Sequence, residues 1–293
     1  MPKFGWVRGV RGYLQLLHPG PSAVCTAVTT VAGWSAWRQA GQSRLEAGWA
    51  ARLACASAAM ALAQVSTGVL NDAFDAPWDR THQPYKPIAQ GAVSRRDAWL
   101  IGIACGGASA LFARLAGRAA LRVMLVGLAS GWSYSLGLSR TPFSFLPFAT
   151  GLSTVPLLGP AAVGLPLPGR GQAAVLAAGL GVGLHLANGG PDIERDRLAG
   201  RRSLPVLLGD QGSRAASHLL LGSGALAVAV STPTGGRRWA WGGAAACAGL
   251  VGADRLGPRR ERSRGGHPFV LPALAGATLA VGWLLGRARV AAP

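Results

Sequence analysis

The sequence predicts an all-α membrane protein with about nine transmembrane helices. Half of the 293 residues are hydrophobic and only 14% are charged, so the chain fits neither a disordered protein nor an ordinary soluble domain. Nine apolar segments reach or approach the roughly 20 residues that a helix needs to cross a bilayer core. A formal net charge of +18 often indicates nucleic-acid binding, but with so apolar a composition it favours a polytopic membrane protein with basic loops and no nucleic acid as partner.

The nine segments follow one another through short polar connections. The first approaches full length, and the second reaches it and is followed by a cluster of acidic residues. The third is short, the sixth precedes a second acidic cluster, and the eighth is rich in Gly and Ala with moderate hydropathy. None has an Asp or Glu at its middle, and their small residues allow close helix packing in lipid. In order, they cover residues 20–37, 48–70, 98–113, 119–138, 145–165, 171–189, 215–232, 237–253 and 267–286.

These segments leave no room for a soluble domain, so we expect one integral-membrane domain over residues 1–293. The stretch Met1–His18 is basic and amphipathic but lacks a small-residue cleavage site, and we do not expect a removable signal peptide. The cysteines are far apart and form no Cys-x-x-Cys pair, which predicts neither a zinc site nor a disulfide framework. They are Cys25, Cys55, Cys105 and Cys247.

The basic residues predict an orientation in the membrane. Of the 29 Lys and Arg residues, 18 fall in the N-terminus and the connections after segments two, four, six and eight. The positive-inside rule places these connections, and both acidic clusters, in the cytoplasm. Arg outnumbers Lys by 27 to 2, which indicates a GC-rich source, and we expect a bacterial cell membrane.

Six of the 11 acidic residues lie in two short stretches, both at a membrane boundary on the predicted cytoplasmic side. Residues four apart share a helix face, so Asn71 lies above Asp75, and Asp192 above Asp196, while Pro77 is expected to end or kink the first helix before Asp79. The six acids are Asp72, Asp75 and Asp79, then Asp192, Glu194 and Asp196.

Like charges at this spacing repel one another, and a divalent cation removes that penalty. All candidate ligands are oxygens, which suits Mg²⁺, an ion that binds a few carboxylates and completes its shell with water or phosphate. Basic residues follow each cluster, as a leaving diphosphate requires when its charge rises. They are Arg80 and Lys86, then Arg195, Arg197, Arg201 and Arg202.

The two stretches resemble the signature of the UbiA superfamily of intramembrane prenyltransferases. Its first motif, Asn-Asp-x-x-Asp-x-x-x-Asp, is complete here and is trailed by Lys86-Pro87-Ile88, as it often is in that family. Its second, Asp-x-x-x-Asp, is commonly followed by Gly, a basic residue and Leu-Pro. A weaker likeness is Tyr134 with the nearby basic Arg140. The motif positions are Asn71, Asp72, Asp75 and Asp79, then Asp192 and Asp196 with Gly200, Arg201, Arg202, Ser203, Leu204 and Pro205.

This resemblance implies a nine-helix bundle around a central cavity and Mg²⁺-dependent transfer of an isoprenoid chain from its diphosphate to a lipophilic, often aromatic, acceptor. It implies metal ligands at Asn71, Asp75, Asp79, Asp192 and Asp196. It implies that the diphosphate substrate is bound by Asn71, Asp75, Asp192 and Asp196 together with Lys86 and Arg201. It implies catalytic roles for Asp72 and Asp79 as ligands or orienters, for Lys86, Arg140 and Arg201 in stabilising the diphosphate charge, and for Tyr134 in lining or polarising the site.

Some positions lie outside the pattern. His18 stands where many relatives carry an Arg, and its charge depends on a pKa near 6.5, so phosphate binding there is not assumed. His185 lies one turn before Asn188 and is read either as an acceptor contact or as a packed residue. Aromatic faces can stabilise an allylic cation in a dry cavity. Candidate walls are Phe74, Trp78, Trp132 and Phe148.

Both acid motifs handle the diphosphate, so neither identifies the acceptor. A terpene cyclase on the same scaffold, in which the cation is quenched internally, therefore remains an alternative to the transferase. A transporter is disfavoured because the acids sit at segment ends and no segment carries a charge at mid-bilayer. The expected partners are a prenyl diphosphate, a lipophilic acceptor and membrane lipid.

Overall fold

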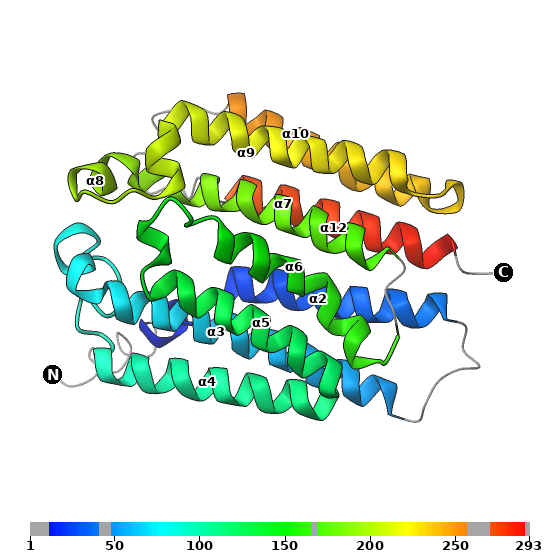
Figure 1. Ribbon diagram of the computed structural model, residues 1–293, viewed down its shortest axis with the longest axis horizontal. Coiled ribbons are helices and arrows are strands. Elements are labelled where there is room, and N and C mark those ends of the chain that lie inside the picture. The colour runs from blue at the N-terminus through cyan, green and yellow to red at the C-terminus, as the bar shows by residue number, and fades with distance from the viewer. Residues whose placement is uncertain (1–11, 41–47, 166–168, 257–269, 291–293) are drawn as a thin grey trace, which may run out of the picture.

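The computed structural model describes residues 12–40, 48–165, 169–256 and 270–290, which contain helices and no strand. Nine helices of 17 or more residues lie within these ranges (Figure 1). The all-α prediction is confirmed. The long helices are α2 (Pro19–Gln39), α3 (Trp49–His82), α4 (Arg95–Ala116), α5 (Arg118–Ser135), α6 (Leu146–Ala162), α7 (Arg170–Gly189), α9 (Leu204–Ser231), α10 (Arg237–Leu256) and α12 (Val270–Val290).

Each long helix coincides with one of the expected apolar segments, although α3 and α9 extend well beyond theirs. The first residues of the ninth segment, 267–269, lie outside the described residues. Four stretches within the described chain are long and apolar enough to cross a membrane, so nine membrane spans remain a prediction. They are Trp49–His82, Arg95–Ala116, Arg170–Leu198 and Leu204–Ser231.

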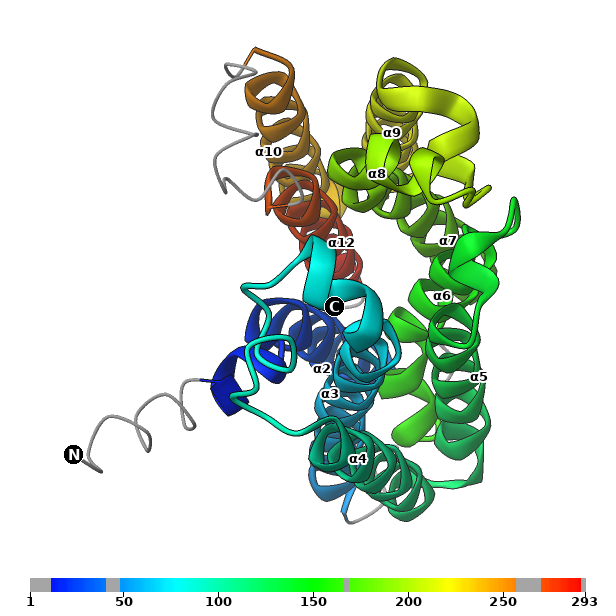
Figure 2. The ribbon, with the colours of Figure 1, turned by 90° about the vertical axis from the view of Figure 1, so that its left-hand side faces the viewer.

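The long helices form a closed ring in sequence order, which Figure 2 shows end on. From α2 to α7 each helix contacts the next, α7 then contacts α9, α9 contacts α10 and α10 contacts α12. The ring closes where α12 contacts α2, and α6 also contacts α2. Because both ends of the helical chain meet, the bundle surrounds a central axis onto which the inner helix faces project.

Small residues allow the closest crossings. A Cβ on Gly159 of α6 would collide with the backbone of Thr29 and Gly33 on α2, and the Thr29 hydroxyl donates to the Val155 carbonyl at 2.9 Å. The α10–α12 crossing has the same character, since a Cβ on Gly243 would lie 2.7 Å from the Thr278 carbonyl oxygen. Backbones that approach this closely gain dispersion contacts that Leu-sized side chains would prevent.

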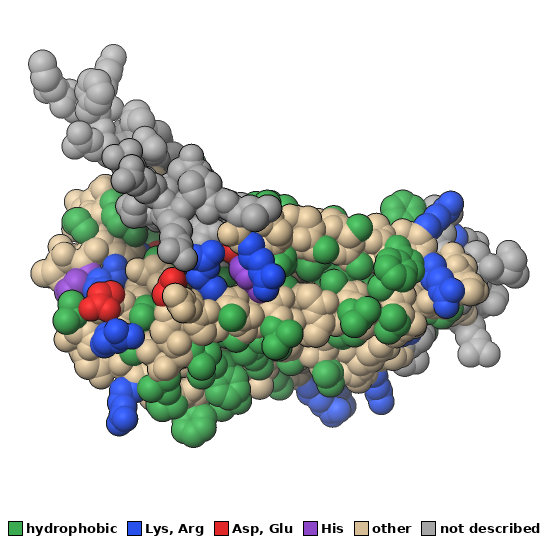
Figure 3. All heavy atoms as spheres, turned by 90° about the horizontal axis from the view of Figure 1, so that it is seen from above, with side chains coloured by type: hydrophobic (Ala, Val, Ile, Leu, Met, Phe, Trp, Pro, Cys, Tyr) green, Lys and Arg blue, Asp and Glu red, His purple; other side chains and the backbone are tan. Residues whose placement is uncertain are grey.

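The end of α3 that carries the first acid motif and the connections next to both motifs lie at one end of the bundle, on the left in Figure 1. They include the loop 83–94 after α3, the turn η2 (Leu138–Arg140) after α5, and the turn η3 (Gly190–Asp192) with α8 (Ile193–Leu198) after α7. On the face shown in Figure 3, acidic side chains appear only toward this end. On this face the acidic side chains therefore gather toward the end where the two motifs meet, whereas basic side chains occur at both ends.

Candidate active site

The first acid motif lies on the last three turns of α3, which runs through Pro77 to His82. The helix does not end at Pro77, so that part of the expectation is wrong. Proline lacks the N–H that would bond the carbonyl of Ala73, four residues earlier. Arg95 of α4 supplies the missing donor, because its Nε donates to that carbonyl oxygen at 2.8 Å. With its orphaned acceptor satisfied, the helix continues and keeps Asp79 in line with the rest of the motif.

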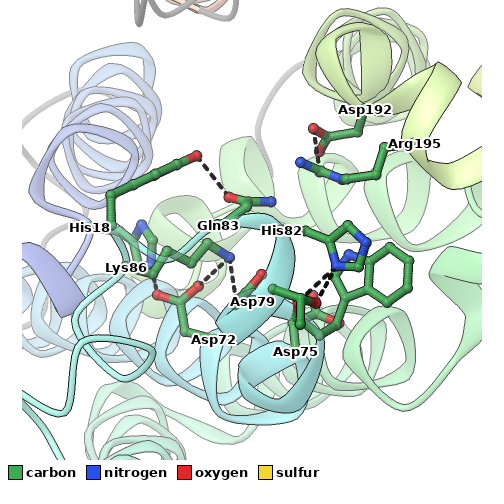
Figure 4. A network of polar contacts seen from close by, with 12 residues as sticks. His18, Asp72, Asp75, Asp79, His82, Gln83, Lys86, Asp192 and Arg195 are labelled. Atoms are coloured by element: carbon green, nitrogen blue, oxygen red, sulfur yellow. Dashed lines mark hydrogen bonds and ion pairs between the residues drawn. The ribbon is translucent and has the colours of Figure 1, made fainter.

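Two of the motif carboxylates, Asp72 and Asp79, are buried and face Lys86. The Lys86 ammonium lies 3.0 Å from Asp72 Oδ1 and 2.9 Å from Asp79 Oδ2, while His18 Nε2 lies 2.9 Å from Asp72 Oδ2 (Figure 4). Burial alone would lower the pKa of the Lys86 ammonium, but the two carboxylates outweigh it and hold that pKa above its usual 10.5. Lys86 is therefore a charged clamp on this face of the motif.

Asn71 and Asp75 are half-buried and belong to a different part of the motif. Asp75 Oδ1 lies 3.6 Å from the guanidinium of Arg140 in η2. Asp75 is thus turned toward the segment that follows α5, not toward Lys86. The motif divides into a clamped pair, Asp72 and Asp79, and Asp75, which faces Arg140.

The second motif occupies η3 and α8, directly after α7. Asp192 forms an ion pair with Arg195, and Asp196 Oδ1 lies 3.1 Å from the Arg201 guanidinium. Arg201 also stacks over the indole of Trp78, 4.6 Å from its centroid. This cation–π contact joins the segment after α8 to the end of α3, because Trp78 is part of that helix.

The two motifs meet at the end of the bundle. Asp196 lies close enough to both Asp75 and Asp192 to interact electrostatically with them, and the three carboxylates lie within the same range of Tyr134 of α5. Figure 4 shows Asp75 and Asp79 on one side and Asp192 with Arg195 on the other. An open cleft of about 590 Å³ lies between the end of α3 and α8. It is lined by Trp78, His82, Glu194, Arg195, Leu198 and Ala199.

Aromatic groups lie beside the carboxylates, deeper in the bundle. Tyr134 contacts Phe148 edge to face, with centroids 5.2 Å apart, and the buried imidazole of His185 lies 5.0 Å from Phe148. Two other expected wall residues serve packing: Phe74 lies edge-on against Trp99 of α4, and the Trp132 Nε1 donates to Ser66 Oγ at 3.1 Å.

Three residues in or near the site carry contacts that sequence reasoning did not assign. His18, at the start of α2, bonds Asp72, Arg95 completes α3, and Ser144 bonds His185. His18 stands directly before a Pro in the sequence, which marks a helix start but not a partner 54 residues away. Asp254 lies at a segment end, as expected, in the last turn of α10; it is buried there and lies 2.8 Å from His218 of α9, a contact that the sequence does not indicate.

The donor set fits Mg²⁺. Asp79 is almost fully buried, yet its Oδ1 has no hydrogen-bond partner, and nearby Trp78 Nε1 and Arg195 Nε are buried donors without an acceptor. The free Asp79 oxygen could bind a cation, and the two free N–H groups could bind an anion, so this set suits a metal–diphosphate. Among the described residues no three His, Cys or acidic side chains converge as a complete metal cage. Mg²⁺ needs only one or two carboxylates when phosphate and water supply the other ligands.

The sequence profile of the UbiA prenyltransferase family matches residues 26–271. Similar curated proteins are digeranylgeranylglyceryl phosphate synthases. The protein from Halobacterium salinarum is 32% identical over 244 residues, which cover 82% of this chain and 84% of the relative. That from Natronomonas pharaonis is 30% identical over 224 residues, which cover 75% and 76%.

Solved structures share the arrangement of helices. An apo UbiA homologue from Aeropyrum pernix K1 has a TM-score of 0.68 at 20% identity, covering 88% of this chain and 96% of its own. A UbiA homologue from Archaeoglobus fulgidus bound to GPP and Mg²⁺ has a TM-score of 0.65 at 18% identity, covering 92% and 99%. At such identities the likeness establishes the fold.

Proposed function

This chain belongs to the UbiA prenyltransferase family, and we propose that it transfers an isoprenoid chain from a prenyl diphosphate to a lipophilic acceptor in the membrane. It is accordingly an integral membrane enzyme. The observation that carries the proposal is the meeting of two acid motifs, remote in sequence, with three basic side chains at one end of the helix ring. That arrangement is suited to a metal-bound diphosphate.

We assign the metal–diphosphate to the half-buried groups Asn71, Asp75, Asp192 and Asp196. Asp79 adds its unpartnered Oδ1, in agreement with its place among the expected ligands. When bound, Mg²⁺ neutralises diphosphate oxygens and makes diphosphate a better leaving group. The four carboxylates supply the oxygen ligands that such an ion prefers.

The basic residues divide into two roles. Arg140 and Arg201 each lie on a motif carboxylate and can exchange that contact for a phosphate oxygen, which a planar guanidinium binds with two donors. Lys86 is engaged by Asp72 and Asp79, so its assigned role is to hold those carboxylates in place. In this scheme the charge that develops on the departing diphosphate is met mainly by the two arginines.

The aromatic groups of α5 and α6 face the prenyl cation that forms when the bonding electrons leave with the diphosphate oxygen. Tyr134 lies near the carboxylates and contacts Phe148, and we place the prenyl carbon beside these two rings. Their faces stabilise positive charge, and the surrounding helices exclude water that would capture the cation. The acceptor then attacks the prenyl carbon and loses its proton.

The acceptor is a separate proposal. The curated relatives are named for making digeranylgeranylglyceryl phosphate. On that similarity we propose a prenylated glyceryl phosphate as the first acceptor class, with small aromatic acids as the second. We further propose that the motif-bearing end faces the cytoplasm. The relatives named above come from archaea, and a bacterial membrane stays a prediction.

The function is tested with protein purified in detergent and returned to lipid nanodiscs. Labelled prenyl diphosphates of several chain lengths are incubated with Mg²⁺ and a prenylglyceryl phosphate, an aromatic acid or no acceptor. The expected result is a prenylated acceptor and one equivalent of pyrophosphate, abolished by EDTA and restored by Mg²⁺. A cyclic hydrocarbon formed without any acceptor would contradict the transferase assignment and favour the cyclase.

A further inference from the structure

A buried serine joins three segments just behind the candidate site. Ser144, in the connection between η2 and α6, is fully buried. Its Oγ lies 2.9 Å from Nε2 of His185 in α7 and accepts the backbone N–H of Leu204, the first residue of α9, at 2.9 Å. One side chain therefore holds the entrance of α6, the C-terminal part of α7 and the start of α9 together.

Ser144 makes both contacts with its single hydroxyl group. The Leu204 N–H can only donate, so Ser144 Oγ accepts there. Ser144 can donate its own proton to His185 Nε2, or accept from a protonated Nε2 through its second lone pair, so the contact forms with either tautomer of the ring. His185 Nδ1 is buried and has no partner. His185 therefore acts through a hydrogen-bonding atom at the Nε2 position.

The three segments joined by Ser144 carry the two arginines of the site. Arg140 lies four residues before Ser144 and reaches Asp75 of the first motif. Arg201 lies three residues before Leu204 and reaches Asp196 of the second. A second tie runs between the same segments, since the Arg202 N–H donates to the Arg140 carbonyl at 3.1 Å. The spacing of the two guanidiniums therefore depends on how these two segments are held.

We propose that Ser144 and His185 are positioning residues that set the two arginines for binding the diphosphate, a role that rests on the proposed function of the site. Neither residue touches the substrate. Both act through the backbone of the segments that end in Arg140 and Arg201. Their loss should weaken diphosphate binding while the affinity for the acceptor is unchanged.

The test measures binding of inorganic pyrophosphate with Mg²⁺ to the full chain in nanodiscs, by titration calorimetry. The variants are Ser144→Ala, His185→Asn and His185→Gln. A Gln amide places an oxygen near the position of Nε2, whereas the shorter Asn reaches only that of Nδ1. Ser223→Ala is the matched control, because that exposed hydroxyl bonds only within α9. Size-exclusion profiles and thermal unfolding show which variants are folded.

Ser144→Ala and His185→Asn are expected to raise the Kd of Mg-pyrophosphate about fivefold or more, and His185→Gln less than about twofold, as the loss of one buried hydrogen bond predicts. Equal losses in the Gln and Asn variants would overturn the proposal, since they would indicate packing. Wild-type affinity in every folded variant would overturn it as well. If Ser144→Ala is not recovered folded, the His185 pair decides the question.

A double-mutant cycle separates positioning from general damage. In the background Arg140→Ala with Arg201→Ala, adding Ser144→Ala should change the Kd by less than about twofold, because the groups through which it acts are gone. An undiminished effect in that background would refute the role. If the wild-type chain binds no Mg-pyrophosphate, the proposed function itself fails. That outcome is distinct from a site that binds but ignores these substitutions.

Discussion

The Lys86 ammonium and the Asp79 carboxylate form an ion pair of 2.9 Å across the end of α3. The chain turns back on itself to make it: the Gln83 N–H donates to the Asp79 carbonyl at 2.8 Å, and the Lys86 N–H to the Gln83 carbonyl at 3.0 Å. Lys86 also reaches Asp72, which lies two turns before Asp79 on the same face of α3. Two buried carboxylates without a cation would cost several kcal/mol, so Lys86 is what allows the first motif to remain helical.

Replacing Lys86 should therefore destabilise the protein as well as inactivate it. We expect Lys86→Met to lower the free energy of unfolding by about 3 kcal/mol, because buried Asp79 loses its ion pair and buried Asp72 keeps only His18. Thermal unfolding in detergent measures the effect. The double variant Lys86→Met with Asp79→Asn should recover part of the lost Tm, since one orphaned charge is removed. A single variant with the wild-type Tm would show that the ion pairs are not needed.

The same pair predicts a flat pH response up to strongly alkaline conditions. The pKa of Lys86 is raised in the folded state, so its contribution is fully present below the unfolded value, near 10.5, and is lost as pH rises through the folded value. The Tm difference between wild type and Lys86→Met should thus stay constant from about pH 7 to 9.5 and shrink only above about pH 10.5. A difference that already falls between about pH 7 and 9 would point to another titrating group.

The helices and the two acid motifs could be predicted from the sequence because both are local patterns. Apolar length fixes where a helix can cross the bilayer, and a spacing of four places two side chains on one face. The effect of Pro77 could not be predicted this way. Whether proline ends a helix depends on a donor for the orphaned carbonyl, and here the donor comes from Arg95, 22 residues further along the chain.

Contacts between remote residues escaped prediction for the same reason. The sequence indicates that Asp72 shares a motif with Asp75, but not that His18 and Lys86 engage one and Arg140 the other. The roles of the aromatic residues divide similarly. Phe148 borders the candidate site while Trp132 packs between helices, and nothing in composition distinguishes the two.

Removing the Asp75 carboxylate, which faces Arg140, should abolish turnover without unfolding the protein. Asp75→Asn keeps the side-chain volume and takes away the negative charge, so kcat/KM should fall at least about 100-fold, as for other groups that stabilise charge in the transition state. Prenyl transfer at saturating Mg²⁺ measures this. Asp210→Asn, on the exposed surface of α9, is the control and should behave like wild type. Full activity in Asp75→Asn would refute the assignment of the metal–diphosphate to this face.

The second motif should be required in the same way and should act jointly with the first. Asp192→Asn is expected to lose activity and to shift the Mg²⁺ dependence to higher concentrations, because fewer oxygen ligands remain for the ion. Adding Asp75→Asn should then cost much less than it does alone, since residues that serve one bound group act as a unit. Kinetic assays of both single variants and the double variant measure the coupling. Fully additive losses would indicate two independent sites.

The crossing of α2 and α6 should tolerate no added methyl group. A Cβ on Gly159 would collide with the Thr29 carbonyl and lie 2.7 Å from the Gly33 nitrogen, both backbone atoms that cannot rotate away. Gly159→Ala should force the helices apart, weaken the bond from Thr29 to the Val155 carbonyl and cost about 2 kcal/mol, as overpacking of a close interface does. Gly107→Ala on α4 adds the same methyl in open space and should be neutral or slightly stabilising, because Ala is the better helix former. Thermal unfolding of the two variants side by side measures the difference, and equal Tm values would show that the crossing is loose.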